Sequence, residues 1–223
     1  MQMRSTPTIA AVTIGQSPRD DIVPEMQSLV PGAAWIQAGA LDGASDDEIA
    51  RLAPASGDFP LVTRLADGRT VIVSEASIHP WLEAAVHRVE QAADVVILLC
   101  SGTFSLACRV PLLLPGPLLA AAARVVAGER PIAVFTPEAS QVEPQRSRWR
   151  NAGFNAAVYF ASPYHPTDFR LLGVRARDDG ADLVVLDCLG YTRRMKAEVA
   201  AASGVPVLLV RSLTARIAAE LVS

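Results

Sequence analysis

Short apolar runs rich in β-branched residues alternate along the chain with windows whose apolar residues recur every three or four positions. The runs that predict strands are Thr8–Ile14, Asp94–Leu99, Pro131–Thr136, Ala156–Phe160, Asp182–Leu186 and Pro206–Val210. Several are almost wholly apolar, as strands covered on both faces are. Because strand and helix signals alternate, the pattern predicts an α/β fold with largely parallel sheets.

Helical periodicity marks the segments between the strands. The apolar residues of 82–89 and of 213–221 each fall on one face of a helix, and the second set predicts a closing helix. The segment Ser17–Asp20 predicts a further helix start, with Ser17 as the N-cap and Pro18 at the first helical position.

One segment departs from this alternation. Two β-prone runs within 61–73 flank Asp67-Gly68, which is typical of a β-hairpin. We expect the hairpin to belong to an insertion of about residues 40–77, which also contains an acidic helix start at Asp46–Glu48.

An internal repeat divides the chain. Residues 93–102 read ADVVILLCSG and residues 181–190 read ADLVVLDCLG, with six of ten positions identical. Upstream, Ile9–Thr13 is echoed by Ile132–Thr136. The repeat predicts two similar α/β lobes related by a pseudo-two-fold axis, the first covering residues 1–115 and the second 116–210. The closing helix, 211–223, is a candidate for completing the first lobe.

Cys100 and Cys188 occupy the same position in the two repeats, each just after a strand. Ligands of open α/β sheets bind beyond the carboxyl ends of the strands. Two thiols facing one cleft suit proton transfer at carbon, in which a thiolate removes a proton from one face and a thiol delivers one to the other. A thiol is partly ionised near pH 7, so no cofactor is needed. Cys108 is interpreted as a packing residue.

A substrate carboxylate would need N–H and hydroxyl donors around these cysteines. The candidates lie in the turns that follow the strands, and they are Gln16, Ser17, Ser101, Gly102, Thr103, Thr136, Gly190 and Thr192. Arg19 is either a clamp for the carboxylate or the solvated partner of Asp20 or Asp21. Asp187 is expected to hold a backbone amide or a helix start, and Tyr191 either closes over the substrate or packs in the core.

Composition narrows the classes of partner. The 20 basic and 23 acidic residues give a net charge of −3, which argues against nucleic-acid or membrane binding as the main role. Three cysteines, an odd number, favour a reducing compartment, and no signal peptide is recognised, so we expect a cytoplasmic protein. The three histidines have no metal-ligand spacing, so no metal site is expected. A homo-oligomer is possible, but the sequence shows no interface.

Several motifs resemble those of the bacterial AroM family. They are Ile14–Arg19, Gly39–Gly43, Pro60–Leu65, Cys100–Phe104 and Asp187–Tyr191, and they occur in order over nearly the whole chain. The paired cysteines and duplicated halves are also similar, more distantly, to the aspartate/glutamate racemase superfamily. The resemblance implies a racemase-like fold with the active site between two lobes. Racemases of this type carry Cys-Asn-Thr and Gly-Cys-Thr, whereas this chain has Cys100-Ser101-Gly102-Thr103 and Asp187-Cys188-Leu189.

These observations predict a cofactor-independent racemase or epimerase that acts on a small carboxylate with Cys100 and Cys188 as the acid–base pair. One alternative uses a single cysteine, for cis–trans isomerisation or decarboxylation. A second is a non-catalytic small-molecule-binding protein linked to aromatic metabolism. A third is a redox switch through a Cys100–Cys188 disulfide.

Overall fold

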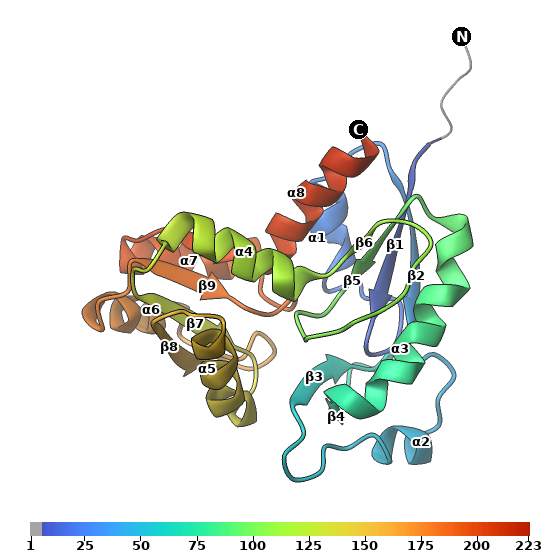
Figure 1. Cartoon of the computed structure of the whole chain (residues 1–223), viewed down its shortest axis with the longest axis horizontal. Helices are drawn as coiled ribbons and strands as arrows, with labels where there is room; N and C mark the ends of the chain where they lie inside the picture. The colour runs from blue at the N-terminus through green and yellow to red at the C-terminus, as the bar shows by residue number, and fades with distance from the viewer. Residues whose placement is uncertain (1–5) are drawn as a thin grey trace. The chain divides into compact units, whose positions relative to one another are not determined.

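The computed structural model describes residues 6–223, which form two compact units (Figure 1). The first unit runs to Pro115 and also includes Thr214–Ser223, whereas the second is Gly116–Leu213. Within residues 6–223, no helix combines the length and the hydropathy needed to cross a membrane.

A four-stranded parallel sheet forms the centre of the first unit. Its strands are β1 (Thr8–Thr13), β2 (Ala34–Gly39), β5 (Val95–Leu98) and β6 (Leu112–Leu113), in the order β2-β1-β5-β6. The two central strands, β1 and β5, are almost entirely apolar and buried, which is why the sequence shows them as continuous hydrophobic runs.

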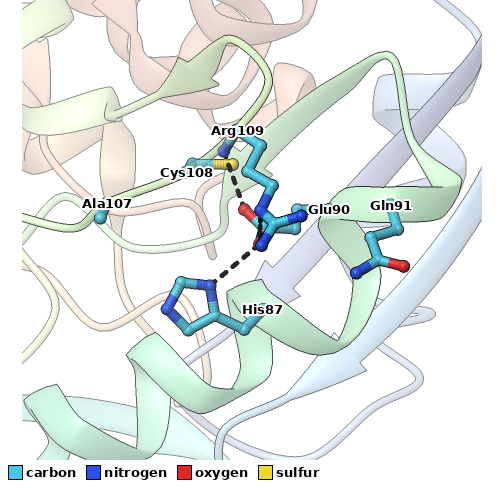
Figure 2. Close-up of a pocket in the computed structure, with 6 residues that line it drawn as sticks. All are labelled: His87, Glu90, Gln91, Ala107, Cys108 and Arg109. Carbon is cyan, nitrogen blue, oxygen red and sulfur yellow. Dashed lines mark hydrogen bonds and ion pairs between the residues drawn. The ribbon is translucent and has the colours of Figure 1, made fainter.

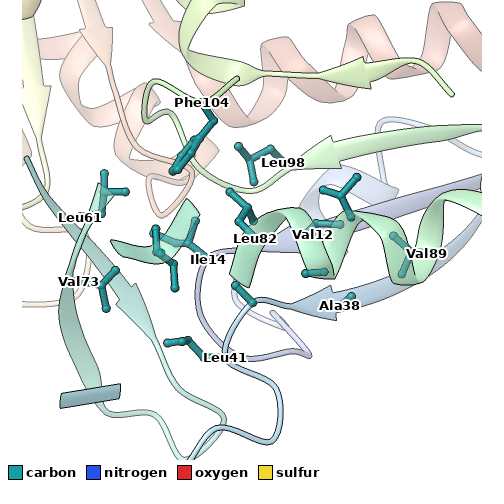
Figure 3. Packing of buried hydrophobic residues seen from close by; sticks show 14 of the residues in the cluster. Val12, Ile14, Ala38, Leu41, Leu61, Val73, Leu82, Val89, Leu98 and Phe104 are labelled. Atoms are coloured by element: carbon teal, nitrogen blue, oxygen red, sulfur yellow. The ribbon is translucent and has the colours of Figure 1, made fainter. Parts of the chain in front are cut away.

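Three α-helices lie between these strands along the chain. They are α1 (Val23–Gln27), α2 (Asp46–Ala50) and α3 (Glu75–Val89), which continues into the short 3₁₀ turn η1 (Glu90–Ala92). α2 begins at a capping box in which Ser45 and Glu48 bind each other's backbone N–H groups. The periodic residues of α3 face the sheet, so Leu82 and Val89 join Val12, Ala38 and Leu98 in one core (Figure 3).

The β-hairpin predicted around Asp67-Gly68 is present in the first unit. β3 (Pro60–Arg64) and β4 (Thr70–Ser74) pair antiparallel, and Gly68 adopts a φ of 88° in the turn between them. Leu61 and Val73 point into the core beside Ile14 and Leu41 (Figure 3). The hairpin therefore shares the core of the sheet. That it is an insertion stays a prediction.

The second unit repeats the sheet of the first. β7 (Ile132–Thr136), β8 (Ala156–Phe160), β9 (Leu183–Leu186) and β10 (Val207–Leu209) are parallel in the order β10-β9-β7-β8. The helices of this part of the chain are α4 (Pro115–Ala127), α5 (Val142–Asn151), α6 (Phe169–Asp178) and α7 (Arg193–Ser203), together with the 3₁₀ turn η2 (Ala139–Gln141). The last helix, α8 (Val210–Val222), begins in the second unit and continues into the first, which includes Thr214–Ser223.

The likeness between the units extends to individual hydrogen bonds. Leu99 N–H donates to the Val12 carbonyl, at 2.7 Å between N and O, and Asp187 N–H donates to Phe135 in the same way, at 3.1 Å. These residues correspond to one another in the sequence repeat. The predicted α/β fold of two similar lobes with mostly parallel sheets is confirmed. A pseudo-two-fold axis between them stays a prediction.

The sequence pattern missed some elements and misplaced one. Strands β2 and β6 were not predicted, because β2 is only partly buried and β6 has two residues. The helix start predicted at Ser17–Asp20 is wrong, since α1 begins at Val23. The Ser17 N–H and hydroxyl both donate to the carboxylate of Asp42, so Ser17 caps no helix.

The hairpin lies against the turn that follows β1. Gln16 N–H donates to the Arg64 carbonyl at 3.2 Å, and Ala66 N–H donates to the Gln16 side-chain oxygen at 2.9 Å. A Cβ at position 15 would lie 2.2 Å from the Arg64 carbonyl oxygen and 2.4 Å from Thr63 Oγ1. Glycine is therefore required at position 15 for this close approach.

We predict that Gly15→Ala destabilises the protein by about 2 kcal/mol, as overpacking against a backbone atom does. Amide hydrogen exchange should become faster in β3 and β4, because the hairpin must move away. Gly57→Ala is the control, since a Cβ at position 57 would have no atom within 4 Å and only the φ of 94° is strained there. Unchanged exchange in β3 and β4 of Gly15→Ala would contradict the docking.

Candidate active site

Cys100 and Cys188 follow their strands at equivalent positions. Each lies two residues beyond the end of a strand, β5 for Cys100 and β9 for Cys188. The N–H two residues later donates to each sulfur, from Gly102 at 3.4 Å and from Gly190 at 3.3 Å. Neither cysteine forms a disulfide, and both are half-buried. A backbone donor on sulfur favours the thiolate, so both turns have the same means of stabilising a reactive cysteine.

Side chains approach the glycine of each turn closely. A Cβ at Gly102 would lie 2.7 Å from Glu75 Oε2, and a Cβ at Gly190 would lie 2.5 Å from the Tyr164 hydroxyl oxygen. Glu75 and Tyr164 therefore belong to the surroundings of the two cysteines. Sequence reasoning singled out neither of them.

Glu75, the first residue of α3, holds the turn after Cys100. Its Oε2 accepts the Thr103 N–H at 2.8 Å. The Thr103 side chain is exposed and Ser101 is half-buried. The backbone donors of Gly102 and Thr103, expected to bind a substrate carboxylate, are thus engaged by Cys100 and Glu75.

Asp187 is buried and its carboxylate is directed at α5. Its Oδ2 accepts from Gln145 Nε2 and from Trp149 Nε1, both at 3.1 Å. These partners are side chains of a helix, whereas a backbone amide or a helix start was expected. Asp187 thereby ties the end of β9 to α5.

Tyr191 lies wholly inside the second unit. Its hydroxyl donates to the Ala161 carbonyl at 2.6 Å, and its ring meets Phe169 edge-on at 6.0 Å between centroids. Burial, reinforced by the charges of Cys188 and Asp187, raises the pKa of Tyr191 well above its usual value. The phenol therefore stays protonated and supports the turn from within the core. Contact with a substrate stays a prediction.

Two further side chains hold the Cys188 turn. Thr192 caps α7, accepting the Met195 N–H on its hydroxyl oxygen at 3.2 Å. Arg211, at the start of α8, is buried and donates from Nε to the Leu189 carbonyl at 2.7 Å. Arg211 was missed because a single arginine in an amphipathic helix gives no sign of burial.

Asp42 organises the end of β1 in the first unit. Its carboxylate accepts from the Ser17 N–H and hydroxyl, both at 2.8 Å, and from the Gly39 N–H at 2.7 Å. Gln16 donates from Nε2 to the Leu41 carbonyl at 3.1 Å. The predicted residues Gln16 and Ser17 therefore connect the turn after β1 to the loop after β2.

Arg19 is 4% exposed and forms a two-point pair with Asp21, in which Nε and Nη2 each donate at 2.8 Å. Nη1 donates to Thr13 Oγ1 at 3.1 Å. Burial alone would raise the pKa of Asp21, but the hydrogen bonds and charge of Arg19 bring it below its usual value. Asp21 is one of the two partners expected for Arg19. The pair was expected to be solvated, whereas the arginine is buried. A role as substrate clamp stays a prediction.

Within each unit the predicted residues lie at the carboxyl ends of the parallel strands. In the first unit, the turns after β1 and β5 follow neighbouring parallel strands. In the second, Thr136 ends β7 beside β9, and its hydroxyl donates to Gln141 Oε1 at 2.8 Å. In each unit, one cysteine and its surrounding polar residues therefore lie at the carboxyl ends of the strands.

Cys108 lies in a separate surface pocket of the first unit (Figure 2). Glu90 is buried there and accepts the Arg109 N–H at 2.8 Å, and it contacts His87 Nδ1 at 3.1 Å. Burial and the nearby Glu90 carboxylate raise the pKa of the Cys108 thiol. Among residues 6–223, no three His, Cys, Asp or Glu side chains come together as a metal site.

We predict that Cys108 is alkylated by iodoacetamide at pH 8 more slowly than a free cysteine, because a raised pKa leaves less thiolate. Glu90→Gln removes the adjacent negative charge and still accepts the Arg109 N–H, so it should accelerate the reaction two- to tenfold, as a pKa change of about half to one unit implies. Peptide mapping by mass spectrometry measures the rate at each cysteine. An unchanged rate at Cys108 in Glu90→Gln would exclude this electrostatic effect.

The chain is similar in structure to several solved racemases and isomerases. Allantoin racemase from Klebsiella pneumoniae matches with a TM-score of 0.63 and 17% identity, covering 97% of this chain and 87% of that one. A glutamate racemase from Bacillus anthracis gives 0.60 and 11%, covering 96% and 81%. The maleate isomerase of Pseudomonas putida gives 0.59 and 14%, covering 94% and 90%. At such low identities these matches show the fold.

No curated protein sequence matches the chain. The family model described as AroM protein, in contrast, matches residues 9–222, which is nearly the whole sequence. The strand-end cysteine turns and the polar turn after β1 lie within this match. The chain belongs to the AroM family.

Proposed function

We propose that this AroM-family chain is a cofactor-independent isomerase of the racemase or epimerase type. It acts on a small carboxylate, with Cys100 and Cys188 as the acid–base pair. The observation that carries the proposal is the N–H to Sγ hydrogen bond found at both strand ends, from Gly102 and from Gly190. A cysteine that only fills space needs no backbone donor on its sulfur.

The proposed reaction moves two protons and no electrons. One cysteine, as the thiolate, removes the proton from the carbon next to the substrate carboxylate. The other cysteine, as the thiol, gives its proton to the opposite face of that carbon, so the configuration inverts. The negative charge that develops on the carboxylate needs hydrogen-bond donors. The Thr103 and Thr192 hydroxyls are proposed for this role, since the Gly102, Thr103 and Gly190 N–H groups already have acceptors.

The structural neighbours support an isomerase, because their names include racemases of glutamate and allantoin and a maleate isomerase. The maleate isomerase favours one second candidate, a cis–trans isomerase with a single nucleophilic cysteine. In that reaction the thiolate adds to a carbon–carbon double bond, the resulting single bond rotates, and the thiolate leaves again. Hydrogen from solvent need not enter the product.

We predict that the protein incorporates deuterium from D₂O at the alpha carbon of both enantiomers of its substrate. A panel of small chiral carboxylic acids, followed by NMR and chiral chromatography, identifies that substrate. Cys100→Ala and Cys188→Ala should each reduce inversion by about 10³-fold, as loss of a general acid or base does.

Cys108→Ala is the matched control, because it removes a thiol from a different pocket. Isomerisation of maleate without deuterium uptake would favour the one-cysteine reaction. Tight ligand binding that survives both substitutions, without turnover of any acid, would favour a binding protein. Either result would overturn the two-cysteine proposal.

A further inference from the structure

The two cysteine turns share a hydrogen-bond pattern, but side chains of opposite charge hold them. A carboxylate, Glu75, binds the backbone three residues after Cys100. A guanidinium, Arg211, binds the carbonyl one residue after Cys188. A charge beside a thiol shifts the balance between its neutral and ionised forms, so the two cysteines have unequal surroundings.

The Cys100 turn lies beside the negative charge of Glu75. The N–H groups of the adjacent residues Gly102 and Thr103 donate to the Cys100 sulfur and to Glu75 Oε2, at 3.4 and 2.8 Å. Chain geometry thus keeps sulfur and carboxylate within about 10 Å of each other. The segment that follows this turn, residues 104–111, contains no helix.

Two other charged or titratable side chains lie on the elements packed around Cys100 in the first unit, and each has a backbone carbonyl as its partner. His79 of α3 contacts the Ser105 carbonyl through Nε2, at 3.0 Å. Arg64 of β3 donates to the Gly68 carbonyl at the tip of the hairpin, at 3.2 Å. Glu75 also offsets the partial positive charge of the α3 N-terminus, where it is the first residue. The Cys100 turn therefore favours the neutral thiol.

The Cys188 turn leads directly into the N-terminus of α7, an 11-residue helix capped by Thr192. That end of a helix carries a partial positive charge, and Arg193 is its first residue. Arg211 adds a full charge that is 1% exposed and so is weakly screened. Together these groups favour the thiolate.

Among the other ionisable groups around Cys188 in the second unit, Asp187 is negative and opposes this effect. Its Oδ2 is directed at α5, where it accepts from Gln145 and Trp149. Arg194 of α7 pairs with Glu198 at 2.9 Å. Two further titratable side chains are Lys196 of α7 and Tyr191 of the turn, which stays neutral. Tyr164, from the segment after β8, approaches Gly190 with its hydroxyl.

We propose that Cys188 rests as the thiolate and Cys100 as the thiol, and that Arg211 and Glu75 are the positioning residues that set this difference. The inference rests on the proposed function and assigns its two roles. In the resting enzyme Cys188 accepts the proton from the substrate carbon and Cys100 donates its own. After inversion Cys188 is the thiol and Cys100 the thiolate, and a proton must pass back through solvent or a reverse turnover to restore the starting form.

Alkylation by iodoacetamide, mapped by mass spectrometry at each cysteine from pH 5 to 10, tests the assignment on the intact protein without substrate. The midpoint of each rate profile reports ionisation independently of how accessible the sulfur is. We expect the midpoint of Cys188 to lie about one pH unit or more below that of Cys100.

Glu75→Gln keeps an acceptor for the Thr103 N–H and removes the charge. It should lower the Cys100 midpoint by about half a pH unit or more and leave those of Cys188 and Cys108 unchanged. A purely structural role of Glu75 would not move the midpoint in this variant. Glu83→Gln is the matched control, because it removes the same charge two turns further along α3, about 12 Å away.

Arg211→Met should raise the Cys188 midpoint, and Arg211→Lys, which keeps the charge, should restore it. Equal midpoints in the wild type, or no change at Cys100 in Glu75→Gln, would overturn the assignment whether or not the Arg211 variants fold. Failure of this assignment can be distinguished from failure of the proposed function. If the two midpoints differ but no acid takes up deuterium, the proposed reaction is wrong, whereas the assignment of charge to the two cysteines stands.

Discussion

Parallel pairing of the two central strands in each sheet is the constraint on which both cysteine turns depend. In the first unit β1 pairs with β5, and in the second β7 pairs with β9. Each ladder continues through one more bond, from Leu99 to Val12 and from Asp187 to Phe135, up to the residue before the cysteine. The sulfur therefore leaves the sheet at a fixed point, and the next turn folds its N–H group back onto it.

Carboxylate side chains hold the strand ends of both units. Asp42 binds the turn after β1, Glu75 binds the turn after β5, and Asp187 binds α5 at the end of β9. Each accepts hydrogen bonds from groups that would otherwise donate to water or to a ligand. The N–H groups of Gly102, Thr103 and Gly190 in the two cysteine turns therefore already have acceptors within the chain.

The hairpin gives the first unit a feature that the second unit's sheet does not repeat. β4 runs directly into α3, so the end of the hairpin fixes the residue at which that helix begins, Glu75. The other strand of the hairpin lies against the turn after β1, where Gly15 leaves room for the Arg64 carbonyl. The hairpin is thereby linked to two strand ends of the sheet, and it brings a negative charge to only one of the two cysteines.

The sequence by itself determined the α/β class, the central strands and the equivalence of Cys100 and Cys188. Continuous apolar runs and a repeat of ten residues are local signals. The strands that they predict are present in the two sheets. Tertiary structure alone decided which polar groups meet. Glu75 lies 28 residues from Thr103 and Arg211 lies 22 from Leu189, distances at which no periodicity operates. Those contacts arise where helices and strands pack, so a sequence pattern cannot encode the charge that each thiol experiences.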